Sequence, residues 1–158
     1  MQLTTHISLT EATKSNTAER LGIDNFPNSY ILSKMQETAT QLFEPLRIFV
    51  GEPIYISSFY RSPELNKAIG GSSRSQHCKG EAIDIDDVYS NRYTNADYFN
   101  YIKENLPFDQ LIWEFGDDEN PSWVHMSYTE DLKKRRGRIL KAIKEKGKTI
   151  YKDITSDC

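Results

Sequence analysis

Two of the chain's three histidines lie near carboxylates in a pattern that could bind a metal ion. His77 precedes Asp84 in a stretch rich in serine and glycine, and His125 follows later in the chain. Two imidazoles and one carboxylate leave a tetrahedral zinc ion with an open fourth position, which is typical of catalytic sites. A carboxylate that is not a ligand, such as Glu114, would then be the general base for water in that position. The spacing alone also allows histidines that are ordinary surface or core residues.

Alternating apolar and polar residues predict three strands that would position these side chains. The strands are expected over 82–86, 110–115 and 123–128. On the first of them, Ile83 and Ile85 should pack inward, which points Asp84 to the opposite face. The same alternation puts Glu114 and His125 each on one face of its own strand. We therefore expect one cleft to collect four side chains: His77, Asp84, Glu114 and His125.

Helical spacing and capping residues predict four helices, and a further strand is expected among them. The helices are expected over about 8–15, from 28 or 29 to near 51, over 62–69 and over 95–106, and the strand over 53–59. Ser8 and Asn95 are the expected caps of the first and last helix, and Pro45 is expected to kink the longest. Helices early and strands mostly late favour the α+β class, with a central, mostly antiparallel sheet and flanking helices.

Length and composition fit a single domain over residues 1–158. With 37% hydrophobic residues, the chain can form one core without disulfides. No apolar stretch approaches the roughly 18 residues of a membrane span. Residues 1–10 have neither a basic head nor an apolar run, so we expect no secretory signal and synthesis in the cytoplasm. Cys78 and Cys158 do not make a disulfide framework and favour a reducing compartment. We expect a monomer.

Charge is distributed unevenly along the chain. Residues 133–148 contain nine basic side chains and one acidic one, whereas the net charge of the whole chain is −3. Because Ile139, Leu140 and Ile143 have helical spacing, we expect a basic helical segment over 131–148. Its favoured interpretation is a solvated helix face, and the alternative is an accessory contact with an anionic cell wall. The segment lacks interleaved aromatic residues and nucleic-acid motifs, so no nucleic-acid partner is expected.

Four segments in order resemble the zinc D-Ala-D-Ala carboxypeptidase and dipeptidase family. Residues 75–84, SQHCKGEAID, fill every fixed position of that family's SxHxxGxAxD signature. Residues 58–66, SFYRSPELN, are similar to its "SGYRSPELN" segment, with Phe59 where the commoner form has glycine. The strands that end in Glu114 and contain His125 also resemble family strands. The likeness runs from about His6 to Tyr128, and its N-terminal part is similar to the branch that includes phage-encoded members.

The resemblance implies a fold like that of hedgehog domains and D-Ala-D-Ala peptidases, and a bound Zn²⁺. Its implied ligands are His77, Asp84 and His125. Glu114 would deprotonate the zinc-activated water and then protonate the leaving amine. Arg61 would face the scissile carbonyl or a carboxylate of the substrate, a role that suits a planar and permanently charged guanidinium.

Two further residues have weaker claims to the site. Trp123 shares a face with His125 and is a candidate wall of the substrate cleft, although a rim aromatic that only packs is an equal alternative. Ser75 is a candidate for orienting the loop before His77, or for binding substrate.

The implied function is hydrolysis of an amide bond in a peptidoglycan stem peptide. The bond is either the terminal D-Ala-D-Ala link, cut by a carboxypeptidase, or an internal L-Ala-D-Glu link, cut by an endopeptidase as in phage endolysins. An enzyme of the endolysin type would act at the cell wall and need its own route there. The alternative is a cell-wall binding module that keeps the fold and the zinc without hydrolysis. Glu114 argues against it, because a binder needs no base beside the metal.

Overall fold

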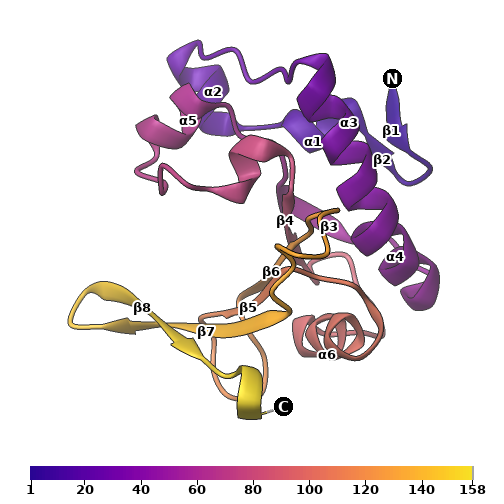
Figure 1. Ribbon diagram of the computed structural model, residues 1–158, viewed down its shortest axis with the longest axis vertical. Helices are drawn as coiled ribbons and strands as arrows, with labels where there is room; N and C mark the ends of the chain where they lie inside the picture. Colours follow the sequence, from indigo (N-terminus) through magenta and orange to yellow (C-terminus); the bar gives the residue numbers. More distant parts are fainter. Residues whose placement is uncertain (158) are drawn as a thin grey trace.

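A six-stranded mixed sheet organises the protein, whose computed structural model describes residues 1–157 (Figure 1); Cys158 lies outside the described part. In spatial order the strands are β3 (Tyr55–Ser58), β4 (Ala82–Asp86), β6 (Trp123–Ser127), β5 (Gln110–Glu114), β7 (Arg138–Glu145) and β8 (Lys148–Asp153). Every neighbouring pair is antiparallel except β5 and β7, which are parallel. The predicted α+β class and mostly antiparallel sheet are confirmed.

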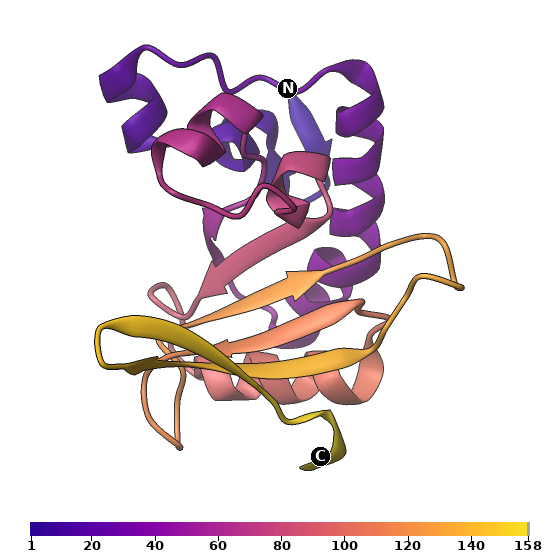
Figure 2. The same cartoon turned by 60° about the vertical axis from the view of Figure 1, so that its left-hand side comes forward.

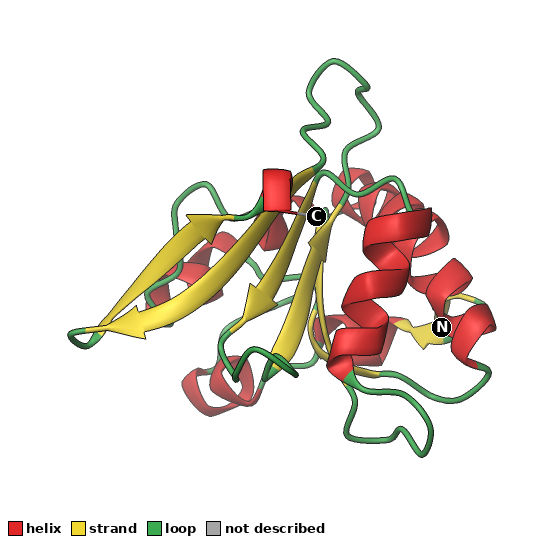
Figure 3. Cartoon of the chain, turned by 90° about the horizontal axis from the view of Figure 1, so that it is seen from below, coloured by secondary structure: helices red, strands yellow, loops and turns green. Residues whose placement is uncertain are grey.

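Most of the helices and a small hairpin lie at the end of the sheet formed by β3 and β4 (Figure 3). The hairpin is β1 (Gln2–Thr4) with β2 (Ile7–Ser8). The α-helices are α1 (Leu9–Thr13), α2 (Asn16–Leu21), α3 (Ser29–Thr38), α4 (Glu44–Val50), α5 (Pro63–Ala68) and α6 (Asn95–Asn105). Short helices of other types are η1 (Ala39–Phe43), η2 (Gln76–Lys79) and η3 (Thr155–Asp157). None of the helices among residues 1–157 is long and apolar enough to cross a membrane.

The main core lies between one face of the sheet and the helices α3, α4 and α6. Ile83 and Ile85 are fully buried there, together with Met126 of β6 and with Tyr98 and Ile102 of α6. Figure 2 shows α6 running along this side of the sheet. Because successive side chains of a strand point to opposite faces, Asp84 is directed to the other face, as the alternation predicted.

The long helix expected from residue 28 or 29 to near 51 is present, with its irregularity before the proline. Asn28 caps α3, and Gly51 ends α4 in a left-handed conformation at φ 66°. Between them η1 is a π-helical turn, in which the Glu44 N–H donates to the Ala39 carbonyl. Pro45 lies in the first turn of α4, where a missing N–H is tolerated. A proline ring displaces the backbone before it, and the wider π turn accommodates it.

The N-cap of helix α6 lies one residue earlier than expected, so the helix begins at Asn95. Thr94, not Asn95, is the N-cap, and it forms a reciprocal capping box with Asp97. Asn95 is instead buried and donates to the carboxylate of Asp86 at 2.8 Å and to the carbonyl of Pro121 at 3.1 Å. Its side chain therefore ties the loop before β6 to the end of β4.

The helix expected over 131–148 is wrong, because this segment consists of a loop, strand β7 and the turn into β8. Ile139 packs in the main core, whereas Leu140 and Ala142 are buried on the opposite face of the sheet. A strand buried on both faces loses its alternation, and its apolar residues then imitate helical spacing. Lys146 and Gly147, with φ of 51° and 76°, make the turn between the strands.

Asp109 ties the loop before β7 to the body of the protein. Its carboxylate is 2% exposed and accepts hydrogen bonds from the Arg136 backbone and guanidinium, at 2.8–3.1 Å, and from Gln76 at 3.0 Å. Burial alone would raise the pKa of Asp109, but the bonds from Arg136 outweigh it and hold that pKa below its usual value. The Asp109 carboxylate is thus ionised, and it fixes the entry to the hairpin.

We expect Asp109→Ala to lower the free energy of unfolding by about 2–3 kcal/mol, because it removes the ionised acceptor of the hydrogen bonds from Arg136 and Gln76. The lowered pKa gives stability that is present above the unfolded pKa and is lost as pH falls through the folded one. Urea denaturation at pH 7 and pH 3 checks both points. Asp153→Ala removes an exposed ion pair with Arg138 and should cost less than about 1 kcal/mol. Equal losses in the two variants would contradict this role of Asp109.

Candidate active site

Three side chains from separate elements meet on the face of the sheet away from the main core. His77 comes from η2, Asp84 from β4 and His125 from the neighbouring β6, where it lies directly opposite Asp84. His77 Nε2 lies 3.3 Å from Asp84 Oδ2, and His125 Nδ1 lies 2.8 Å from Asp84 Oδ1. One ligand atom from each residue lies within 4.8 Å of the others, so the three together could bind a metal ion.

The hydrogen bonding of His77 shows that the site suits a cation. Its Nδ1 lies 2.8 Å from the backbone carbonyl of Phe59, which can only accept, so Nδ1 carries a proton. In the neutral ring, Nε2 then presents a lone pair toward the Asp84 carboxylate, and two acceptors face one another. A metal ion between them removes that repulsion, and a histidine held by a backbone carbonyl is a common arrangement around zinc. Two imidazoles with one carboxylate fit Zn²⁺.

Electrostatics keep Asp84 ionised. Burial alone would raise the pKa of Asp84, but the charge of His77 and His125 in their protonated forms, together with their hydrogen bonds to the carboxylate, holds it far below its usual range. The carboxylate is therefore available as a ligand at any pH near neutrality.

Glu114 lies at the end of β5, next to β6, and its environment has the opposite effect on its pKa. The residue is only 7% exposed, and burial raises the pKa of Glu114 to about 7, with His125 lowering it and Asp84 raising it further. A carboxyl group with a pKa near the working pH can both accept and return a proton.

Phe115 and Gly116 follow Glu114 at positive φ and turn the chain sharply away. A Cβ at Gly116 would lie 2.2 Å from the Asn120 carbonyl oxygen, so only glycine fits there.

Arg61 lies at the cleft and is fixed from several sides. Its guanidinium donates to the Asn66 side chain at 3.0 Å and to the Ser58 hydroxyl at 3.4 Å. Its backbone N–H donates to the carbonyl of His77 at 3.3 Å. The guanidinium is therefore held in place by α5 and β3, and the backbone is joined to the segment that contains His77.

The two remaining candidates also lie at the cleft. Ser75 caps η2 by accepting a hydrogen bond from the His77 backbone N–H at 3.3 Å, so it orients the turn that contains His77. Trp123 is half-buried on β6 opposite Glu114, with its ring 5.4 Å from that of Phe115. The structure thus brings all seven candidate residues to one cleft, of about 1070 Å³.

One wall of this cleft escaped the sequence analysis. It is formed by side chains of the C-terminal hairpin, among them Leu140, Lys144, Thr149 and Tyr151. Tyr151 faces the site: burial raises its pKa, and the negative charges of Glu114 and Asp84 raise it further. The signal that could have found this wall is Gly147 between two short β-prone segments, which is typical of a hairpin turn.

Comparison with known proteins shows the family of the chain. A sequence model described as peptidase M15 matches residues 5–127, which include all seven candidate residues but not the hairpin β7–β8. No curated protein matched the chain. The match covers most of the chain and confirms the resemblance drawn from the four motifs. The protein belongs to the peptidase M15 family.

Proposed function

We propose that the protein is a zinc-dependent peptidase that hydrolyses an amide bond in peptidoglycan stem peptides. M15 peptidases are zinc enzymes, and the residues His77, Asp84 and His125 fit that metal. The observation that supports hydrolysis most directly is Glu114, a buried carboxyl group with a pKa of about 7 in the same cleft as these three ligands. A protein that only bound the cell wall would have no use for such a group.

The roles of the side chains follow from their positions. Zinc held by His77, Asp84 and His125 would supply a Lewis acid that makes water acidic enough to attack at neutral pH. Glu114 accepts the proton from the attacking water as the new C–O bond forms. It then returns that proton to the leaving nitrogen as the C–N bond breaks, so no net proton remains on the enzyme.

The developing negative charge on the carbonyl oxygen needs a fixed donor. Arg61 supplies it, since its guanidinium is already oriented by Asn66 and Ser58 and does not have to reorganise during the reaction. The Phe59 carbonyl plays a supporting part by holding the ring of His77 in one tautomer.

Digestion of purified peptidoglycan by the zinc-loaded protein tests this function, with products identified by mass spectrometry. We expect the wild type to release either one alanine per stem, as a carboxypeptidase, or free stem peptides, as an endopeptidase. A Glu114→Gln protein should release neither. If the wild-type products equal those of Glu114→Gln while zinc analysis shows bound metal in both, hydrolysis of this substrate is excluded and a binding module takes its place.

A further inference from the structure

The hairpin β7–β8 lies beyond the segment shared with the family model, yet it borders the reacting groups. Strand β7 pairs in parallel with β5, so that Glu114 lies beside Ala142, and Ala142 lies opposite Tyr151. These three residues form a row across the sheet on the face of the cleft. Lys144 is two residues beyond Ala142 on the same face and lines the cleft. Its position relative to Glu114 is therefore set by strand pairing, not by a loop.

Positive charge dominates the walls of the cleft. Its lining contains five basic side chains and two carboxylates: Arg61, Arg74, Arg136, Arg138 and Lys144 against Asp84 and Glu114. Both carboxylates are engaged in the proposed metal binding and proton transfer. A bound divalent cation would add to the positive charge. Such a cleft favours a substrate that brings negative charge of its own.

Lys144 differs from Arg136 and Arg138, the two arginines of the C-terminal segment that line the cleft, in having no acidic partner. Arg136 is paired with Asp109 and Arg138 with Asp153. Lys144 donates to the Thr149 hydroxyl at 3.1 Å and lies 5.6 Å from the centre of the Phe115 ring, and no carboxylate of residues 1–157 lies within 4.0 Å of it. Its charge is thus available to a ligand.

We propose that Lys144 binds a carboxylate of the substrate and makes the enzyme selective for acidic peptides. Two residues of a strand span about 7 Å, and an extended peptide in the cleft has the same rise per residue. In a peptide that lies alongside β7 with its reacting bond level with Glu114, the carboxylate bound by Lys144 would be about two residues from that bond. This inference rests on the proposed function and adds the chemistry of the substrate to it.

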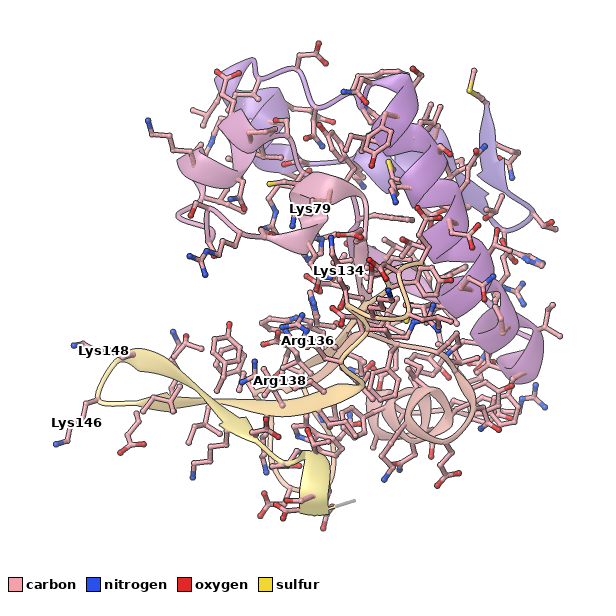
Figure 4. The ribbon with its side chains drawn as sticks, in the orientation of Figure 1. Lys79, Lys134, Arg136, Arg138, Lys146 and Lys148 are labelled. Carbon is pink, nitrogen blue, oxygen red and sulfur yellow. The ribbon has the colours of Figure 1, made fainter. Side chains whose placement is uncertain are left out.

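The same hairpin supplies matched controls. Lys146 and Lys148 are exposed and lie at its tip, away from Arg136, Arg138 and the body of the protein (Figure 4). Neither lines the cleft, and Lys148 lies opposite Glu145 in the strand pair. A general effect of removing positive charge from the hairpin would appear in these variants too, whereas a contact with substrate would not.

The test uses two peptides: L-Ala-D-Glu-L-Lys-D-Ala-D-Ala, and the same peptide with its carboxylates converted to carboxamides. Binding to zinc-loaded Glu114→Gln protein is measured by calorimetry. In that background, Lys144→Gln should weaken binding of the carboxylate peptide by roughly 5–10-fold and leave the carboxamide peptide unchanged. Lys146→Gln and Lys148→Gln should change neither, and Lys144→Arg should keep the preference for the carboxylate.

The role of Lys144 would be overturned if the Glu114→Gln protein, with Lys144 intact, bound the two peptides equally. It would also be overturned if Lys144→Gln, Lys146→Gln and Lys148→Gln lost the same affinity for the carboxylate peptide. Failure of the proposed function would be seen separately, as absence of cleavage of peptidoglycan by the wild type. If peptidoglycan is cut and Lys144→Gln still binds both peptides as its parent does, only the inference on Lys144 fails.

Discussion

Glu114→Gln should lower kcat about 10²–10⁴-fold and leave the zinc content unchanged, because glutamine keeps the size of the side chain but cannot accept a proton. Glu114 belongs to β5 and is not one of the three residues whose ligand atoms converge. KM should therefore change far less than kcat. The rate of product release from peptidoglycan and metal analysis of the purified protein measure the two quantities. Glu119→Gln, an exposed acid in the turn after β5, is the matched control and should retain full activity.

The same substitution should stabilise the metal-free protein at neutral pH. Because the folded pKa of Glu114 is raised from 4.5 to about 7, the folded state binds its proton more tightly than the unfolded state does. That stabilisation is full below pH 4.5 and is lost as pH rises to 7, a loss of roughly 3 kcal/mol. Glutamine does not titrate, so Glu114→Gln should lack this loss. Urea denaturation at pH 5 and pH 8 would contradict the argument if both proteins lost the same amount.

Sequence patterns predicted that the three candidate ligands would meet, because each lies on, or next to, a strand with one buried face. Ile83 and Ile85 are both fully buried. Because side chains alternate along a strand, Asp84 between them points to the opposite face of the sheet. Strand pairing then brings Asp84 and His125 together, since Asp84 lies opposite His125 and His125 lies opposite Ile112. The bond from His77 to the Phe59 carbonyl joins residues far apart in sequence, and no local pattern encodes such a contact.

The hairpin could not be predicted from alternating apolar and polar residues, because the apolar residues of β7 are buried on both faces of the sheet. Ile139 belongs to the main core, and Leu140 and Ala142 to a second, smaller cluster with Ile112 on the face of the cleft. Which residues of β7 are buried depends on its pairing with β5. Residues 131–148 taken alone carry no information about that pairing. The wall of the cleft is therefore a product of sheet pairing rather than of local periodicity.

Asp84→Asn should abolish the response of the protein to zinc. In the wild type, zinc at about 100 times its Kd should raise the free energy of unfolding by about 2.7 kcal/mol, since only the folded chain brings the three ligands together. Asparagine keeps the shape of the side chain but removes the charge that both histidines face at 2.8 and 3.3 Å. We expect the zinc-induced shift and the peptidase activity to disappear together, as followed by denaturation with and without zinc.

Asp86→Asn is the control for this result, because Asp86 is on the same strand and face but accepts from Asn95 and not from a histidine. Its zinc-induced shift should equal that of the wild type. A full shift in Asp84→Asn would mean that the two imidazoles bind the metal without the carboxylate. Asp84 would then orient the two imidazoles through its contacts with them rather than bind the metal. The two variants differ by two positions on one strand, so the comparison separates metal binding from the general cost of removing a carboxylate from this face of the sheet.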